Sequence, residues 1–553
     1  MNAVLLAVIG WVSFFLGYRF YSKFIAKRIY RLSSQAETPA HTYEDGVDYV
    51  PTHPFVLWGH HFTSVAGAAP IVGPAIAVIW GWLPAFLWVI LGTVFIGGVH
   101  DFGALWASVR NQGRSIGALT EEVVGKRARS LFMIVIFLLL LMVNAVFAVV
   151  IADLFVEYGS SVLPAWSAIA VAVVIGYLLY RRGVGLLFPS LGGLAVLYFM
   201  VYLGDIAPVL ELGATQWILI LFAYAFIASL LPVWLLLQPR DFINSLQLFI
   251  GLGLLYLGVL FANPEVVAPA FNRNVPADAP PIIPLLFVTI ACGAISGFHG
   301  LVSSGTSAKQ LNQETDSRFV GYLGAVGEGS LALATILATT AGFASFADWQ
   351  EVYQSFGESG VGAFVEGGAT LINQGLGLPI TFATTLLAVI AVLFASTTLD
   401  TSVRLQRFII QEWGQIYQIA PLTNRYLSTA LAIFSCLLLA FGAGGTDGTG
   451  GMTIWPLFGT TNQLLAALTL LVISVLLVKL ARSYWYTLIP LVFVLLMTVF
   501  ALLLQLAEFW IDGDYFLLFL DILILIAAVW VILESALVFN RARKEAQTES
   551  SPH

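Results

Sequence analysis

The sequence predicts an all-α integral membrane protein. Hydrophobic residues make up 59% of the 553 residues and charged residues only 10%, with a mean hydropathy of +0.91. Soluble domains carry about 25% charged residues. Apolar stretches of membrane-spanning length follow one another along the chain, and the basic residues between them fall on alternate connections. Together these observations predict one transmembrane domain over residues 1–553.

Fifteen apolar stretches are long enough to cross a hydrocarbon core of about 30 Å as helices that rise about 1.5 Å per residue. They lie near 2–22, 57–80, 84–108, 130–153, 163–181, 184–204, 216–237, 243–262, 284–304, 320–343, 377–400, 425–443, 454–478, 484–506 and 515–538. The long connections between them are the proline-rich 263–283 and the segment 344–376. The apolar piece Val361–Leu376 of the latter is expected to form a re-entrant or interfacial helix.

The basic residues predict the orientation. If the first span runs from outside to inside, every second connection is cytoplasmic, and these connections hold all of the 24 lysines and arginines except Arg273. The opposite connections are acidic or neutral, as at Asp205 and Glu351. This is the positive-inside pattern. We therefore predict an N-terminus outside and a C-terminus in the cytoplasm. The first apolar stretch has its basic residues after it, which favours a retained helix over a cleaved signal peptide.

Two segments rich in glycine and proline interrupt the apolar stretches, at 59–74 and 293–300. Irregular backbone at membrane depth is tolerated only where protein or a water-filled cavity surrounds it. Both segments are therefore predicted to be broken helices, whose ends offer N–H groups to an anion or carbonyls to a cation. Close helix packing through Gly293 and Gly297 explains the second segment equally well.

The two interrupted segments run in opposite directions in the predicted topology, as corresponding helices of an inverted repeat do. Counting five spans from each gives a first repeat over 57–204 and a second over 284–478. The helix pair at 216–262 is then an insertion, and 484–553 adds C-terminal helices and a tail. We expect a five-plus-five inverted repeat on this basis.

The substrate site is predicted to lie between the two broken segments, where largely backbone groups would bind a small anion because helix N-termini attract negative charge. The candidates are His61, Ser64, Ala66, Gly67, Ser296, Gly297 and His299. The two histidines are expected near the site. A histidine there fits a structural donor as well as a titrating group.

Glu328 is the clearest candidate for ion coupling. It lies well inside the apolar stretch 320–343, between Gly327 and Gly329. An ionisable group in hydrocarbon costs about 3 kcal/mol or more unless it is paired or hydrated. We expect Glu328 to couple transport to a proton or to contact the substrate. The alternative is a structural carboxyl that is hydrogen-bonded to another helix.

Ser396, Thr397 and Thr398 precede Asp400 on one span and are further ion-coupling candidates. Together with carbonyls of the first broken segment, the hydroxyls would offer the oxygen ligands that a sodium ion takes. Back-bonding of these hydroxyls to their own helix is the alternative. Asp400 is itself a coupling candidate, although a pair with Arg404, four residues on, is the simpler expectation.

No metal site is predicted. His100 and Asp101 are adjacent near the end of a span, and adjacent residues are expected to point in different directions on a helix. Cys292 and Cys436 give neither a disulfide framework nor the spacing of metal ligands.

Four blocks of the sequence resemble the carbon starvation protein A family. They are HHFTSVAGAAPIVGP at 60–74, ACGAISGFH at 291–299, TTLDT at 397–401 and WPLFGTTNQLLAA at 455–467, in the order that the family has them. The resemblance implies a bacterial cytoplasmic-membrane importer of pyruvate, or of small peptides in some members, used when preferred carbon runs short. It also implies kinship with the amino acid, polyamine and organocation transporters, whose core is an inverted five-helix repeat.

The predicted function is secondary active transport of pyruvate or small peptides across the inner membrane, coupled to a proton or sodium gradient. A Gly-x-x-x-x-Gly-Lys-Ser/Thr phosphate loop is not found in the sequence, which excludes ATP hydrolysis by that route. An enzyme is not expected, because histidines and carboxylates are scattered. A channel or facilitator without ion coupling is the alternative. We expect no cofactor besides transported H⁺ or Na⁺. The expected partners are the lipid bilayer and a small-molecule substrate, and nothing supports nucleic acid.

Overall fold

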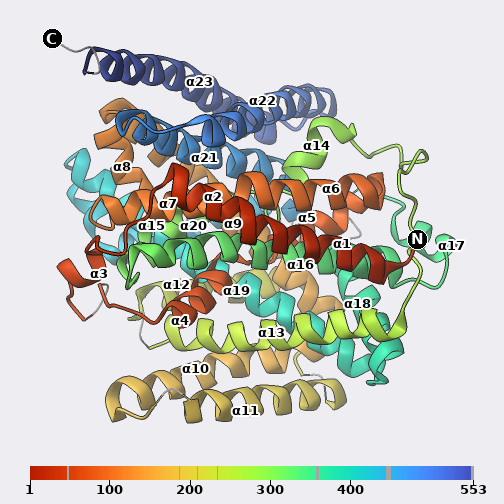
Figure 1. Cartoon of the computed structure of the whole chain (residues 1–553). Coiled ribbons are helices and arrows are strands. Elements are labelled where there is room, and N and C mark those ends of the chain that lie inside the picture. Colours follow the sequence, from red (N-terminus) through yellow and green to blue (C-terminus); the bar gives the residue numbers. More distant parts are fainter. Residues whose placement is uncertain are drawn as a thin grey trace.

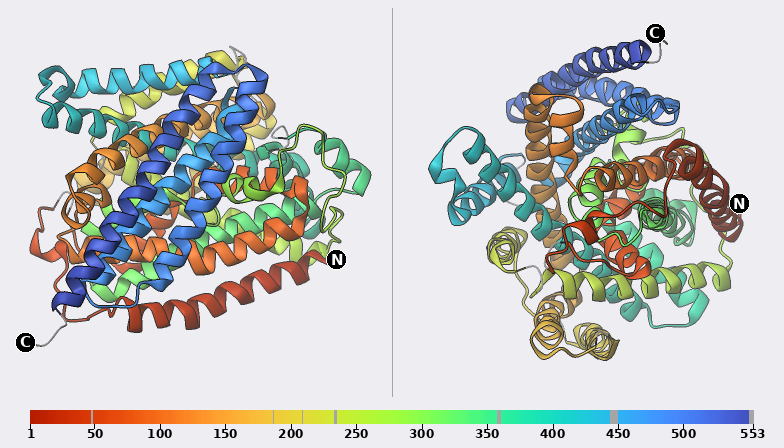
Figure 2. Two further views of the ribbon diagram at one scale, coloured as in Figure 1. Left: turned by 90° about the horizontal axis from the view of Figure 1, so that it is seen from above. Right: turned by 60° about the vertical axis from the view of Figure 1, so that its left-hand side comes forward.

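The chain is helical throughout the part that the structure describes. The computed structural model describes residues 1–46, 49–185, 187–207, 209–232, 235–356, 360–443 and 450–549. Within these ranges it has no β-strand beyond isolated bridges. The helices run across one bundle, and the two ends of the chain lie at opposite ends of it (Figure 1; Figure 2, left). The predicted all-α class is confirmed.

The α-helices are α1 (Ala3–Leu16), α2 (Ser22–Phe24), α3 (Pro39–Thr42), α4 (Pro54–Val65), α5 (Ala69–Ala77), α6 (Trp82–Gly92), α7 (Gly98–Arg110), α8 (Ile116–Val123), α9 (Lys126–Glu157), α10 (Val162–Arg182), α11 (Leu187–Ile206), α12 (Ala214–Leu230), α13 (Leu237–Ala262), α14 (Ile282–Thr289), α15 (Gly297–Gly305), α16 (Leu323–Ala341), α17 (Phe346–Val352), α18 (Gly360–Leu376), α19 (Ile380–Ile416), α20 (Arg425–Gly442), α21 (Gly450–Lys479), α22 (Trp485–Asp512) and α23 (Tyr515–Glu549). Short 3-10 and π-helical turns extend or join them at Gly17–Tyr21, Ile25–Ile29, Val78–Trp80, Thr93–Gly97, Gly159–Ser161, Ser307–Lys309, Glu314–Asp316, Arg318–Tyr322 and Ala420–Thr423.

Among the described residues, 12 helices are long and apolar enough to cross a membrane, or up to 13 if one bent pair is counted as a single span. The bent pair is Pro54–Val65 with Ala69–Trp80, at an angle of 52°. The predicted span 216–237 is the shorter helix α12, and the predicted span 284–304 is divided between α14 and α15. Both predicted broken helices are thus broken, and the count of fifteen crossings stays a prediction.

The centre of the bundle is formed by α9 and α19, which pack along each other, and by the almost fully buried α16 and α21. In Figure 1, α10 and α11 line the lower edge, and α22 and α23 line the upper edge. Outer helices expose large apolar side chains, such as Phe15 at 62%, Phe188 at 80% and Leu537 at 62%. Such faces suit contact with lipid chains, because soluble monomers rarely expose many large apolar side chains together.

The predicted helix at Val361–Leu376 is present as α18, and it packs into the bundle against α5, α13, α16 and α19. The contact depends on a close backbone approach. A Cβ added at Gly367 would lie 2.2 Å from the carbonyl oxygen of Ala338 at the end of α16. Glycine is therefore required at this contact between α18 and α16.

Candidate transport and coupling site

The two broken helices meet inside the bundle. The first break lies between α4 and α5, and the second lies between α14 and α15. A Cβ added at Gly73 of α5 would lie 2.4 Å from the carbonyl oxygen of Thr289, the last residue of α14. In the second break Gly293 adopts a φ of +96°, a conformation that glycine reaches without strain. The two breaks therefore lie close together in the bundle.

Backbone donors expected to bind an anion are bonded within the chain in this conformation. The N–H groups of Ala66 and Gly67 donate to carbonyls of α4, at 2.9 and 3.0 Å. At the start of α15 the N–H of Phe298 donates to the side-chain oxygen of Asn462, at 3.0 Å. An anion would therefore have to displace these partners or use other donors.

Asn462 of α21 also holds the residues around the second break. Its Nδ2 lies 3.1 Å from Ser296 Oγ and 3.3 Å from Cys292 Sγ. A Cβ added at Gly297 would lie 2.4 Å from the carbonyl oxygen of Asn462. In the first break, Ser64 Oγ donates to the carbonyl of His60 at 2.8 Å, within its own helix.

A cavity of about 10 Å³ lies between the two breaks, which is about the room that one water molecule occupies. Its walls are formed by Val65, Gly67, Ala69, Val143, Phe147, Cys292, Phe298, Thr398 and Phe458. The Oγ1 atom of Thr398 is buried and has no hydrogen-bond partner among the described residues. A Cβ added at Gly67 would lie 2.6 Å from this oxygen. The hydroxyl of Thr398 on α19 therefore faces the first break.

A cluster of four buried titratable side chains lies beside the second break. His299 of α15 bonds through Nδ1 to Asp101 Oδ2 of α7, at 2.8 Å. Its Nε2 lies 3.2 Å from Glu328 Oε1 of α16, an ion-pair distance at which the groups are poorly aligned for a hydrogen bond. The other oxygen of Asp101 lies 2.7 Å from His100 Nδ1. The side chains are at most 3% exposed.

This cluster contains Glu328 and His299, which were predicted separately, and two residues that sequence reasoning set aside. The expectation that His100 and Asp101 point apart is wrong, because the Asp101 carboxylate bonds to the preceding imidazole and to His299 at once. The signal that could have found Asp101 is a carboxylate inside an apolar stretch, which was used for Glu328.

His61 is close to the cluster but has a different partner. Its Nδ1 lies 2.8 Å from Ser307 Oγ, just beyond α15. Its Nε2 is buried and has no hydrogen-bond partner in the part of the chain that the structure describes. A Cβ added at Gly324 of α16 would lie 3.0 Å from this Nε2. His61 therefore joins α4 to the segment after α15 and faces the helix that carries Glu328.

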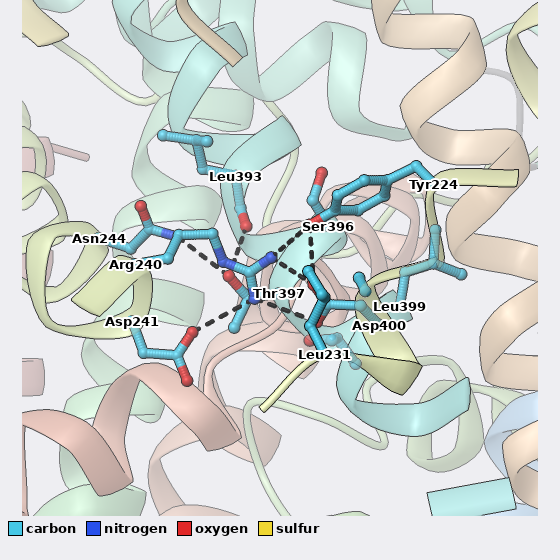
Figure 3. A network of polar contacts seen from close by, with 12 residues as sticks. Tyr224, Leu231, Arg240, Asp241, Asn244, Leu393, Ser396, Thr397, Leu399 and Asp400 are labelled. Atoms are coloured by element: carbon cyan, nitrogen blue, oxygen red, sulfur yellow. Dashed lines mark hydrogen bonds and ion pairs between the residues drawn. The ribbon is translucent and has the colours of Figure 1, made fainter. Parts of the chain in front are cut away.

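Asp400 belongs to a second buried network (Figure 3). Both carboxylate oxygens pair with the guanidinium of Arg240 on α13, one of them with Nη2 at 3.0 Å. Tyr224 of α12 donates to Asp400 Oδ2 at 2.9 Å. The expected pair between Asp400 and Arg404 is wrong, because Arg404 Nη2 donates instead to backbone carbonyls at the end of α12, at 2.8 and 2.9 Å. Sequence spacing within one helix missed a stronger partner on another.

The neighbouring hydroxyls of α19 are mostly bonded to their own helix. Ser396 Oγ donates to the carbonyl of Val392 at 2.7 Å, and Thr397 Oγ1 to that of Leu393 at 2.9 Å. Thr397 Oγ1 also accepts from Asn244 Nδ2 at 3.0 Å. The back-bonding alternative is thus correct for Ser396 and Thr397, while Thr398 presents its hydroxyl to the cavity.

A family model described as carbon starvation protein CstA matches residues 2–347 and 342–501. The chain belongs to the carbon starvation protein CstA family. The CstA peptide transporter of Campylobacter jejuni is 33% identical over 565 residues, which cover 90% of this chain and 80% of that protein. The pyruvate/proton symporter BtsT of Escherichia coli is 31% identical over 583 residues, which cover 90% of this chain and 81% of that protein.

Among solved structures, a manganese transporter variant from Eremococcus coleocola matches with a TM-score of 0.47 and 14% identity, covering 90% of this chain and 98% of that one. The resemblance to the CstA family that four sequence blocks indicated is confirmed by the family match over most of the chain.

Proposed function

We propose that this protein imports a small carboxylate, either pyruvate or a short peptide, together with a proton, as a secondary active transporter of the inner membrane. The observation that carries the proposal is the buried cluster of Asp101, His299 and Glu328 beside the broken helices. The names of the relatives support it, since one is a pyruvate/proton symporter and another a peptide transporter. Use during carbon starvation follows from the family.

The cluster stores a proton because of its charge balance. A protonated His299 between two ionised carboxylates leaves a net charge of −1, and one more proton makes the cluster neutral. Burial favours the neutral state, since charge in hydrocarbon is costly. The three groups lie on α15, α7 and α16, so a movement of the broken helix changes both ion-pair distances. We infer that Glu328 loads the proton and that His299, Asp101 and His100 pass it on.

Sodium is the second candidate for the coupling ion. Thr398 Oγ1 is a buried oxygen that faces the first break and that no described residue hydrogen-bonds. A sodium ion there would take this hydroxyl and backbone oxygens near Ala66 and Gly67 as ligands. Ser396 and Thr397 would have to give up their helix carbonyls to join it.

The substrate site of the proposal is the region between the two breaks. Its candidate residues are Ser64, Ala66 and Gly67 at the first break and Ser296 and Gly297 at the second, and of these Gly67 lines the cavity. A cavity of about 10 Å³ is too small for pyruvate, so binding requires the helices to separate. Alternating access supplies this movement when one group of helices rocks against the other.

We infer an inverted repeat that differs from the predicted division into 57–204, an inserted 216–262, and 284–478. α5 packs on α16 as α15 packs on α7, and α13 packs on α4 and α19 as α21 packs on α14 and α9. α12 and α20 each contact α9 and α19, while α8 and α18 occupy matching positions.

These contacts divide the core into two repeats. The first repeat is α4–α7, α9, α12 and α13, and the second is α14–α16 and α19–α21. The inserted pair becomes α10–α11, at the lower edge of Figure 1, and Asp101 and Glu328 fall on corresponding helices.

The orientation is proposed from the charges, with the N-terminus outside. Single cysteines at the exposed positions Ser34 and Glu351 test it. In intact cells the cysteine at position 351 is expected to react with an impermeant thiol reagent and the one at position 34 to stay unlabelled until the membrane is opened. The reverse pattern would refute the orientation. The wild-type protein, whose Cys292 and Cys436 are buried, sets the background.

Transport is tested with purified protein in liposomes, using labelled pyruvate and a labelled dipeptide with proton and sodium gradients imposed separately. We expect one of the two substrates to accumulate when the outside is acidic, and a protonophore to remove the effect. Accumulation driven by sodium alone would favour the Thr398 site. Saturable uptake that neither gradient drives would indicate a facilitator.

A further inference from the structure

A buried polar stripe runs along α13 where this helix faces α19. Arg240, Asn244 and Gln247 are spaced by four and three residues, so they share one face of the helix. Each is at most 2% exposed. Arg240 meets Asp400, and Asn244 meets Thr397. Residue numbers rise along α13 as those of their partners fall along α19, so the two helices are antiparallel.

The stripe has more hydrogen-bonding groups than the chain satisfies. Arg240 Nε, Asn244 Oδ1 and Gln247 Oε1 are buried without partners among the described residues. One turn further on, the contact becomes apolar, since a Cβ added at Gly251 would lie 2.2 Å from Ile390 Cδ1. Unsatisfied polar atoms in a buried helix contact are costly. Polar faces inside membrane helices usually line a water-filled path, and this one is packed shut.

An ion pair closes one end of the stripe. The guanidinium of Arg240 holds both oxygens of Asp400, and it also lies 3.3 Å from Asp241 Oδ1 and 2.8 Å from the hydroxyl of Tyr224 (Figure 3). The side chains of Arg240 and Asp400 are at most 1% exposed. The pair therefore joins α13 to α19 in the buried interior.

α19 also has hydrogen bonds to α12 that do not involve the Arg240–Asp400 pair. α19 is fastened to the end of α12 by Arg404 and by Arg407, whose Nη1 donates to the carbonyl of Ser229 at 2.8 Å. These bonds engage backbone and do not depend on α13. Breaking the Arg240–Asp400 pair thus removes the ionic contact between α13 and α19 and leaves the bonds between α19 and α12 intact.

The middle of the stripe lies at the level of the cavity, because Thr397, the partner of Asn244, is next to Thr398, which lines the cavity. The first turn of α13 is cytoplasmic in the proposed orientation. We propose that the stripe of Arg240, Asn244 and Gln247 is the closed cytoplasmic exit path of the substrate, and that the Arg240–Asp400 pair is its gate. When the gate opens, Arg240 offers the leaving substrate a guanidinium, which binds carboxylates in a forked geometry. The inference rests on the proposed function.

The gate is tested by thiol labelling from the cytoplasmic side of inside-out vesicles. Cysteines at Asn244 and Gln247 are expected to react slowly with a charged reagent in the parent protein. Adding Asp400→Asn is expected to raise their rates about tenfold, because the open population grows. Ile250→Cys is the control. Position 250 lies on an exposed apolar face of α13, which is expected to contact lipid, so a charged reagent should not react with it in either background. Unchanged rates at positions 244 and 247 would overturn the proposal.

Two further measurements separate a gate from a structural pair. The double variant Arg240→Gln/Asp400→Asn, which removes both charges of the pair, is expected to label as fast as Asp400→Asn, and it replaces that variant if the latter does not fold. Uptake by Asn244→Cys protein should stop once it is labelled, while Ile250→Cys protein treated with the same reagent should keep its uptake. Uptake at an unchanged rate after labelling position 244 would refute the path. Labelling needs no gradient, so a failure of proton coupling would leave this result readable.

Discussion

Replacing Glu328 by glutamine is expected to abolish accumulation of substrate against its gradient, while exchange of labelled for unlabelled substrate continues. Glutamine keeps the size of the side chain but cannot gain or lose a proton. The cluster with His299 and Asp101 would then lack the group that loads a proton. The measurement is the ratio of internal to external label in liposomes with an imposed proton gradient, which should fall to the value reached without a gradient.

A buried carboxyl elsewhere in the membrane provides the matched control. Asp521 of α23 is fully buried, and α23 packs on α9, α21 and α22, away from the cluster. Asp521→Asn should therefore leave accumulation unchanged. Asp101→Asn should impair accumulation as Glu328→Gln does, since it removes the carboxylate on the other side of His299. Full proton-driven accumulation by the Glu328→Gln protein would reduce Glu328 to a structural role.

Replacing Gly297 by alanine is expected to destabilise the protein and to lower uptake. The new Cβ would lie 2.4 Å from the carbonyl oxygen of Asn462 and 2.6 Å from the backbone nitrogen of Ala466. Backbone atoms cannot rotate away as a side-chain end does, so α15 must shift from α21. Overpacking of this kind costs about 1–3 kcal/mol. A shift of α15 also moves His299 relative to Asp101 and Glu328. Thermal unfolding in detergent and proton-driven uptake measure the two effects.

Gly305, at the end of the same helix, is the matched control. A Cβ added there meets nothing within 4 Å, and alanine is a better helix former than glycine by up to about 1 kcal/mol. Gly305→Ala should therefore keep uptake and leave the melting temperature unchanged or slightly higher. Equal losses for both variants would mean that the effect does not come from the contact of α15 with α21.

The family resemblance and the broken helices were available from the sequence because each depends on a local pattern. A hydrocarbon solvent demands long apolar runs, and glycine and proline clusters interrupt the helical hydrogen bonds wherever they occur. The same logic found Glu328, since a carboxylate within an apolar run is conspicuous whatever surrounds it.

Partners across helices were decided only by the tertiary structure. The charge of Asp400 was visible, but spacing within α19 suggested Arg404, whereas Arg240 of α13 supplies the ion pair. Asp101 was set aside with His100, yet packing of α7 against α15 brings it to His299. Which polar group on one helix meets which group on another depends on helix register and rotation, and neither leaves a periodic trace in a single sequence. Hydropathy therefore determined which segments form the bundle, and side-chain packing alone decided how the buried charges pair.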